Sequence, residues 1–177
     1  LTHSAFDVNN KKLGRDVMAF AERHNVLAPE QFGSRKNHRS VLAALNERLT
    51  MDLLRQRRQA GALCANDAKS CHDRIVHNAA VLALRRLEMA AAPVHSMFET
   101  LQQAHHHVST AFGISKNSHG ARRDPPLQGV GQGNGAGPAI WAVISTAIIA
   151  AVATQGHGFH IMSALAGALV FFVCCAF

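Results

Sequence analysis

Segments with apolar residues at helical spacing alternate along the chain with segments rich in glycine, proline and polar residues. The clearest pattern begins at Ser40, a residue type that caps helices, and predicts a helix over residues 40–59. Its apolar positions are Val41, Leu42, Leu45, Leu49, Leu53 and Leu54. A weaker pattern nearer the start predicts a short helix over residues 15–23, which ends before Pro29.

The middle of the chain combines a short apolar run with two further helical patterns. Residues 62–65 read as a buried strand, and Asp67 follows at its carboxyl end. Helices are predicted over residues 74–91 and 94–111, the second of them opening directly after Pro93. We therefore expect a helix-rich protein in which an acidic residue follows a buried strand.

A glycine-rich stretch separates this part from an apolar tail. Five glycines fall within residues 129–137, which predicts a loop of unusual backbone freedom. Beyond it, residues 139–153 and 161–177 are apolar and uncharged. Each stretch is slightly shorter than the roughly 20 residues that a membrane-spanning helix needs.

Charge is concentrated in the first part of the chain. Of the 177 residues, the first 123 hold all 18 Lys and Arg residues and 10 of the 11 acidic residues, a net charge of +8. An apolar content of 48% excludes a chain that is disordered by composition. The positive charge favours nucleic acid or an acidic membrane face, and a merely soluble basic surface explains it equally well.

The cysteines and the first residues bear on the compartment. None of the four cysteines forms a CxxC pair, and Cys174 and Cys175 are adjacent, which disfavours a disulfide framework and favours a reducing, intracellular compartment. The opening segment shows no secretory signal pattern. Because the chain begins with Leu1 rather than Met, we expect it to be a fragment at that end.

Three clusters of residues are candidates for a functional site, and each also has a simpler structural explanation. Asp67 and Asp73 offer carboxylates that Mg²⁺ prefers, although a helix cap and a solvated ion pair would use the same residues. The glycines of residues 129–137 allow a close approach to phosphate, or they form a flexible turn. The basic residues around Gly33 suit phosphate contact or a plain surface turn.

The run His105-His106-His107 invites a zinc interpretation, which the expected helix does not favour. Consecutive helical residues point about 100° apart and cannot easily share one ion. We therefore expect a solvated or partly packed histidine run.

Read in order, residues 30–36 (EQFGSRK), 66–75 (NDAKSCHDRI) and 126–138 (PLQGVGQGNGAGP) resemble successive motifs of reverse transcriptases, in particular those of retrotransposons without long terminal repeats. The resemblance covers roughly residues 7–145. It implies an α/β (α+β) fold, a partial right-hand polymerase that is helix-rich and truncated before the catalytic hairpin. Residues 1–60 would form a fingers-like segment and residues 61–177 a partial palm.

The resemblance also implies roles for single residues. Arg35 and Lys36 match the fingers element that touches template and incoming triphosphate. Asp67 matches the first catalytic aspartate, which binds both metal ions, and the carbonyl of Ala68 would contact one of them. His72 stands where the family usually has the Phe or Tyr that blocks a ribose 2′-hydroxyl, so the resemblance does not predict which sugar is selected.

The third motif implies contact with the nascent base pair. Gly131, Gln132 and Gly133 match a glycine-flanked glutamine that lies against the templating base. The intact parent would bind an RNA template, a DNA primer and dNTP, and would transfer nucleotides by RNA-directed DNA polymerase chemistry with Mg²⁺. No Asp or Glu follows Asp124, so the second carboxylate motif is missing and we expect no polymerisation by this chain alone.

Two other interpretations stay open. The charge-free tail suits a small basic membrane-associated protein whose two apolar stretches form a helical hairpin. A nucleic-acid-binding module without polymerase descent would leave the order of the three motifs as coincidence.

Overall fold

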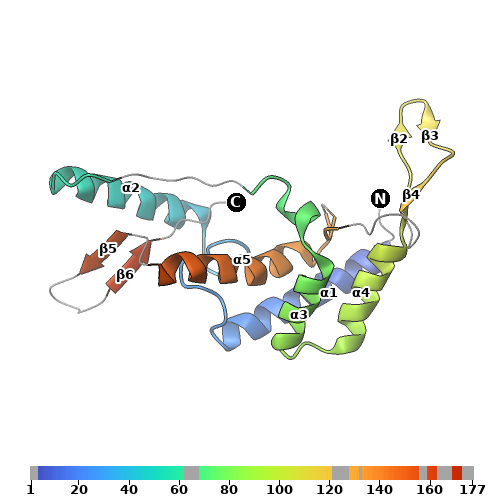
Figure 1. The fold of residues 1–177 in the computed structure, drawn as a ribbon, viewed down its shortest axis with the longest axis horizontal. Coiled ribbons are helices and arrows are strands. Elements are labelled where there is room, and N and C mark those ends of the chain that lie inside the picture. The colour runs from blue at the N-terminus through green and yellow to red at the C-terminus, as the bar shows by residue number, and fades with distance from the viewer. Residues whose placement is uncertain are drawn as a thin grey trace. The chain divides into compact units, whose positions relative to one another are not determined.

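The computed structural model describes residues 4–61, 68–120, 128–131, 133–155, 159–162 and 169–172, the last two ranges as backbone pairing only. Figure 1 shows the order of the elements along the chain. Two compact units, which interleave in sequence, make up the structure. Unit 1 comprises residues 1–17 and 70–141, and unit 2 comprises residues 18–69 and 142–177.

The first helix, α1 (Ser4–Arg23), is much longer than the expected segment of residues 15–23. Its buried face includes Asn10, Leu13 and Val17, each at most 5% exposed. Gly14 lies on the same face and packs against the backbone of Gly135. The hydrophobic pattern missed residues 4–14 of this helix because Asn10 and Gly14 do not count as apolar positions.

Unit 1 contains α3 (His77–Arg86) and α4 (Ala91–Gln103), which pack against each other. They follow a short 3₁₀ helix, η1 (Cys71–Arg74). The buried apolar side chains of these two helices and their connection are Ala80, Leu84, Leu87, Val94, Met97 and Phe98. Helix α3 is shorter than the expected helix of residues 74–91 because residues 71–74 form η1 and Glu88 ends the helix in the left-handed region, with φ of 57°.

The expectation of a helix to residue 111 is wrong, because α4 ends at Gln103 and the chain then forms a two-part hairpin. Strand β1 (His105–His106) pairs antiparallel with β4 (His119–Gly120). Strand β2 (Ser109–Thr110) pairs antiparallel with β3 (Gly113–Ile114) across a two-residue connection. The helix ends early because Ala104, directly after Gln103, adopts an extended backbone with ψ of 137°, and strand β1 follows it.

Unit 2 contains α2 (Ser40–Gln56) and most of α5 (Gly137–Thr154). A small core joins Ala21 and Leu27 to Ala142 of α5. The helix predicted from Ser40 is confirmed, but its apolar stripe is not buried. Val41, Leu42, Leu45 and Leu49 are all exposed, and Ala43 is the buried residue of this helix.

The apolar tail divides into one helix and one strand pair among the residues that the structure describes. Helix α5 is long and apolar enough to cross a membrane, a property that core helices of soluble proteins share, and about a third of its length is buried within the protein. Strand β5 (Phe159–Met162) pairs antiparallel with β6 (Leu169–Phe172). The described residues do not form the helical hairpin of the alternative membrane interpretation, because the second apolar stretch contains β6 and part of β5.

Across the described ranges the fold is mostly helical, with five α-helices and small two-stranded antiparallel sheets. The helix-rich character expected from the sequence is confirmed. The strand predicted over residues 62–65 lies outside the described residues.

Candidate functional site

The candidate site lies in unit 1, where η1 meets the glycine-rich loop (residues 128–136). The amide of Val130 donates a hydrogen bond to the carbonyl of His72 at 2.8 Å, and the amide of Gly129 donates to the carbonyl of Ile75 at 2.8 Å. The side chains of Ile75 and Val130 are both buried. Two sequence motifs far apart in the chain are thus held together by two backbone hydrogen bonds.

Gly129 makes this junction possible. Its φ is 90°, and a Cβ at this position would lie 2.5 Å from the Cα of Asp73. A side chain would therefore both strain the backbone and push η1 away from the loop. Gly131 and Gly133 also have positive φ values, of 74° and 87°, but open space surrounds them.

The buried side chain of His77 also holds this junction together. His77 lies in the first turn of α3, and its Nε2 is 2.5 Å from the carbonyl oxygen of Gly129. Its Nδ1 is 3.2 Å from Nε2 of Gln102. The Gly129 carbonyl can only accept, so Nε2 carries the hydrogen of that bond. The ring also packs against Phe98, with 5.1 Å between the ring centroids, so His77 joins the loop to α3 and α4.

The end of the loop caps helix α5. The amide of Ala136 donates to Oδ1 of Asn134 at 3.0 Å, and the amide of Gly137 donates to the carbonyl of Asn134 at 3.0 Å. These bonds satisfy amides that a helix start leaves without partners. The loop therefore leads directly into α5, as a glycine loop that opens a helix does.

The residues predicted from the second and third motifs are placed as follows. Ala68 is exposed and His72 is half-buried beside the loop, with its ring near Gly137. Gly131 and Gly133 are exposed on the loop. Asp67 and Gln132, the predicted catalytic carboxylate and base-contacting amide, lie outside the described residues. The structure thus brings His72 together with the glycine-rich loop.

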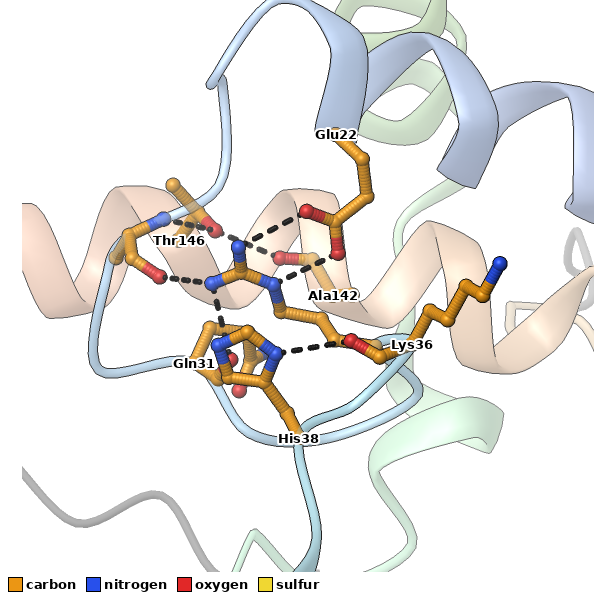
Figure 2. Close-up of polar contacts among 8 residues, drawn as sticks. Glu22, Gln31, Lys36, His38, Ala142 and Thr146 are labelled. Atoms are coloured by element: carbon orange, nitrogen blue, oxygen red, sulfur yellow. Dashed lines mark hydrogen bonds and ion pairs between the residues drawn. The ribbon is translucent and has the colours of Figure 1, made fainter.

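The first motif lies in unit 2, where Arg35 holds the segment after α1 in place. Its Nε donates to Oε1 of Glu22 at 2.9 Å and its Nη2 donates to Oε2 at 3.0 Å, a bidentate ion pair. Its Nη1 donates to the carbonyls of Ala28, at 2.9 Å, and Gln31, at 3.3 Å. Figure 2 shows this group of polar contacts, with Glu22 and Gln31 among the labelled residues.

This pairing has an electrostatic consequence. The hydrogen bond from Arg35 lowers the pKa of the Glu22 carboxyl, and the charges of Arg35 and His38 act in the same direction, against a smaller opposing effect of burial. The Arg35 side chain is 12% exposed, whereas Lys36 is exposed on the surface. Lys36 is therefore the cation of this motif that faces solvent.

Buried polar contacts attach the same segment to α5. Gln31 is fully buried, and its Nε2 donates to Oγ of Ser145 at 2.7 Å. The amide of Ala28 donates to Oγ1 of Thr146 at 3.4 Å. Residues 27–35 are thus fixed to the helix by side-chain contacts.

Metal-ligand chemistry is limited within the described residues. No group of three or more His, Cys, Asp or Glu side chains gathers there in a way that would hold a metal ion. Asp73 is exposed and stands beside the loop as a single carboxylate. One carboxylate does not make the oxygen-rich site that Mg²⁺ needs.

Sequence reasoning missed two structural residues. His77 falls within the predicted helix of residues 74–91, and nothing in its neighbourhood indicates a bond to Gly129, 52 positions away. Glu22 lies near the end of α1 and belongs to none of the motifs in the sequence. A glutamate followed 13 positions later by an arginine carries no periodic signal.

Comparisons of this chain with models of protein families, with curated proteins and with solved structures found no match.

Proposed function

We propose that this chain is a fingers-and-palm segment of a reverse transcriptase of the type without long terminal repeats, that it binds primer–template nucleic acid, and that it does not polymerise DNA alone. The proposal starts from the order of three motifs in residues 30–36, 66–75 and 126–138. The observation that carries it is the junction of the second and third motifs, through the bonds of Val130 to His72 and Gly129 to Ile75.

The glycine-rich loop offers a backbone surface for nucleotide contact. Gly131 and Gly133 are exposed, and open space lies where their side chains would be. A base or phosphate can approach such a backbone more closely than it can approach one with side chains. In the proposed role these glycines flank Gln132, which would contact the nascent base pair.

An exposed cation stands near this loop within unit 1. Arg74 is the last residue of η1 and is exposed, directly before the buried Ile75 that bonds the loop. In the proposed role Arg74 contacts the phosphate backbone of the bound nucleic acid, and in unit 2 Lys36 contacts the triphosphate or template. Such contacts fix the register of the duplex without reading its sequence.

Polymerase activity would require metal ions and carboxylates from two strands. Asp67, with the carbonyl of Ala68, is the proposed ligand set, and Mg²⁺ would supply activation of the primer hydroxyl in the intact parent. The described residues bring only Asp73 to the junction, and no acidic residue occurs in residues 125–177. These residues do not fit a two-metal centre, so we derive no catalytic step for this chain.

A pair of matched arginine variants tests the binding role. Arg74 on η1 and Arg85 near the end of α3 are both exposed, so Arg74→Gln and Arg85→Gln each remove one charge without disturbing the core. Binding to a fluorescent RNA–DNA primer–template hybrid is measured by anisotropy at low salt. We expect Arg74→Gln to weaken binding by roughly tenfold and Arg85→Gln to leave it nearly unchanged.

Equal losses in the two variants would count against a site at the junction, and no binding by the unaltered chain would reject the function. Primer extension with Mg²⁺ and dNTP is measured on the same preparation. We expect no product, and Mg²⁺-dependent extension would contradict the proposed inactivity.

A further inference from the structure

The histidine run is not helical, and its register in the hairpin changes what it can do. His105 and His106 form strand β1, which pairs antiparallel with β4. In this register His106 lies directly opposite His119, and His105 lies opposite Gly120. Side chains of directly opposed residues project from the same face of a strand pair, with Cβ atoms roughly 5 Å apart.

We propose that His106 and His119 together bind one divalent transition-metal ion on the face of the β1–β4 strand pair. Both residues are exposed, so an ion reaches them from solvent. Two imidazoles that project from opposed positions can converge on an ion about 2 Å from each nitrogen. Imidazole ligands favour Cu²⁺, Ni²⁺ and Zn²⁺ over Mg²⁺ and Ca²⁺.

The neighbouring histidines do not belong to this pair. His105 projects from the opposite face of β1, and its Nδ1 is 3.4 Å from Oγ of Ser118. His107 lies beyond the strand, and its Nδ1 is 3.1 Å from the carbonyl oxygen of Ser115. With two protein ligands, the remaining positions of the ion are filled by water, so we expect weaker binding than at a four-ligand structural site.

The backbone around the strand pair keeps this register. The amide of Ser115 donates to the carbonyl of Val108 at 2.8 Å, and the amide of Val108 donates to Oγ of Ser115 at 3.0 Å. These bonds join the β1–β4 pair to the β2–β3 pair beyond it, within the hairpin that follows α4 (Figure 1). The two histidines are therefore presented on a paired backbone before any ion binds.

The test measures the binding of Cu²⁺ or Zn²⁺ to the full chain by calorimetry, with no other ligand present. The variants are His106→Gln, His119→Gln, the double variant, and His105→Gln as the control from the same run. We expect each single variant and the double variant to lower the metal affinity of the tightest site by the same factor, about tenfold or more. One shared ion needs both rings, so removing the second ring adds no further loss. The His105→Gln variant should keep that site.

Additive losses in the double variant would show two independent histidines and overturn the proposal. Retention of the tightest site in His106→Gln, or its loss in His105→Gln, would also overturn it. Circular dichroism of each variant establishes that the helices are intact, and ring-proton signals of His106 and His119 should broaden together at substoichiometric Cu²⁺. Broadening of one signal without the other would contradict the shared site.

Discussion

The carbonyl of His72 accepts a hydrogen bond from the amide of Val130, and this bond joins the η1 segment to the glycine-rich loop. The neighbouring Gly129 donates to Ile75, so the two segments are attached at two points. Because these segments carry the second and third motifs, the junction is both a packing element and the candidate site. The junction depends on Gly129, where no side chain larger than a hydrogen atom fits.

Replacing Gly129 by alanine should destabilise the protein. The new methyl group would meet the backbone of Asp73, and the φ of 90° would add strain. We expect a loss of about 2–4 kcal/mol in the free energy of unfolding, measured by urea denaturation. The matched variant Gly131→Ala, with φ of 74° and open space around it, should cost only about 1–2 kcal/mol. Equal losses would mean that the close contact at Gly129 is not important.

The Glu22–Arg35 pair should make stability depend on pH. Because the folded protein lowers the pKa of Glu22, the ion pair contributes its full stabilisation above the unfolded pKa, about 4.3, and loses it as the pH falls through the lower folded pKa. The variant Glu22→Gln should be less stable at neutral pH, and its stability should change less between about pH 5 and 3. Urea midpoints measured across this range provide the check, and parallel curves for the two proteins would contradict the pairing.

Arginine geometry matters at the same position. Arg35 donates to both carboxylate oxygens of Glu22 and to the carbonyls of Ala28 and Gln31. Lysine keeps the charge but lacks the planar fork, so Arg35→Lys should lose about 1–3 kcal/mol of stability. Thermal unfolding measures the loss, and an unchanged midpoint would show that charge alone suffices.

Glu88, which follows α3, occupies a backbone conformation that suits glycine better. Glu88 has φ of 57°, its amide donates to the carbonyl of Arg85, and the amide of Met89 donates to the carbonyl of Leu84. This is a Schellman ending, in which glycine avoids the cost of the left-handed conformation. We expect Glu88→Gly to stabilise the protein by about 0.5–1 kcal/mol and Glu88→Ala to bring no such gain. A destabilised glycine variant would contradict this account of the helix end.

The exposed stripe of α2 should tolerate polar residues. Leu45 and Leu49 are each 48% exposed, so the double variant Leu45→Gln, Leu49→Gln removes little buried apolar area. We expect a change in unfolding free energy within about 1 kcal/mol, together with less aggregation in light scattering. A large loss of stability would show that the stripe is covered in solution.

Periodicity predicted the helices with continuous apolar faces and missed features that depend on distant partners. The pattern from Ser40 identified α2 correctly, yet it did not show that Leu45 and Leu49 face solvent. The first half of α1 escaped prediction because its buried face includes Asn10 and a glycine contact. Burial is a property of the packed chain, whereas periodicity reports only which residues share a face.

The candidate site was likewise predicted only in part. The glycine spacing indicated a loop of unusual freedom, and the structure places Gly129, Gly131 and Gly133 at positive φ. Nothing in the sequence indicated that Gly129 would contact Asp73 or bond to His77. The hairpin after α4 was missed because His105 and Val108 continue the helical spacing of α4. The structure instead has an extended backbone from Ala104 and pairs β1 with β4.

We propose that this chain binds nucleic acid through its exposed cations. The most direct measurement is the affinity of the unaltered chain for a primer–template hybrid at salt concentrations from about 50 to 200 mM. Our account predicts that the logarithm of the affinity falls linearly and steeply with the logarithm of salt, because phosphate contacts release counterions. No binding at the lowest salt, or an affinity that does not change with salt, would contradict it.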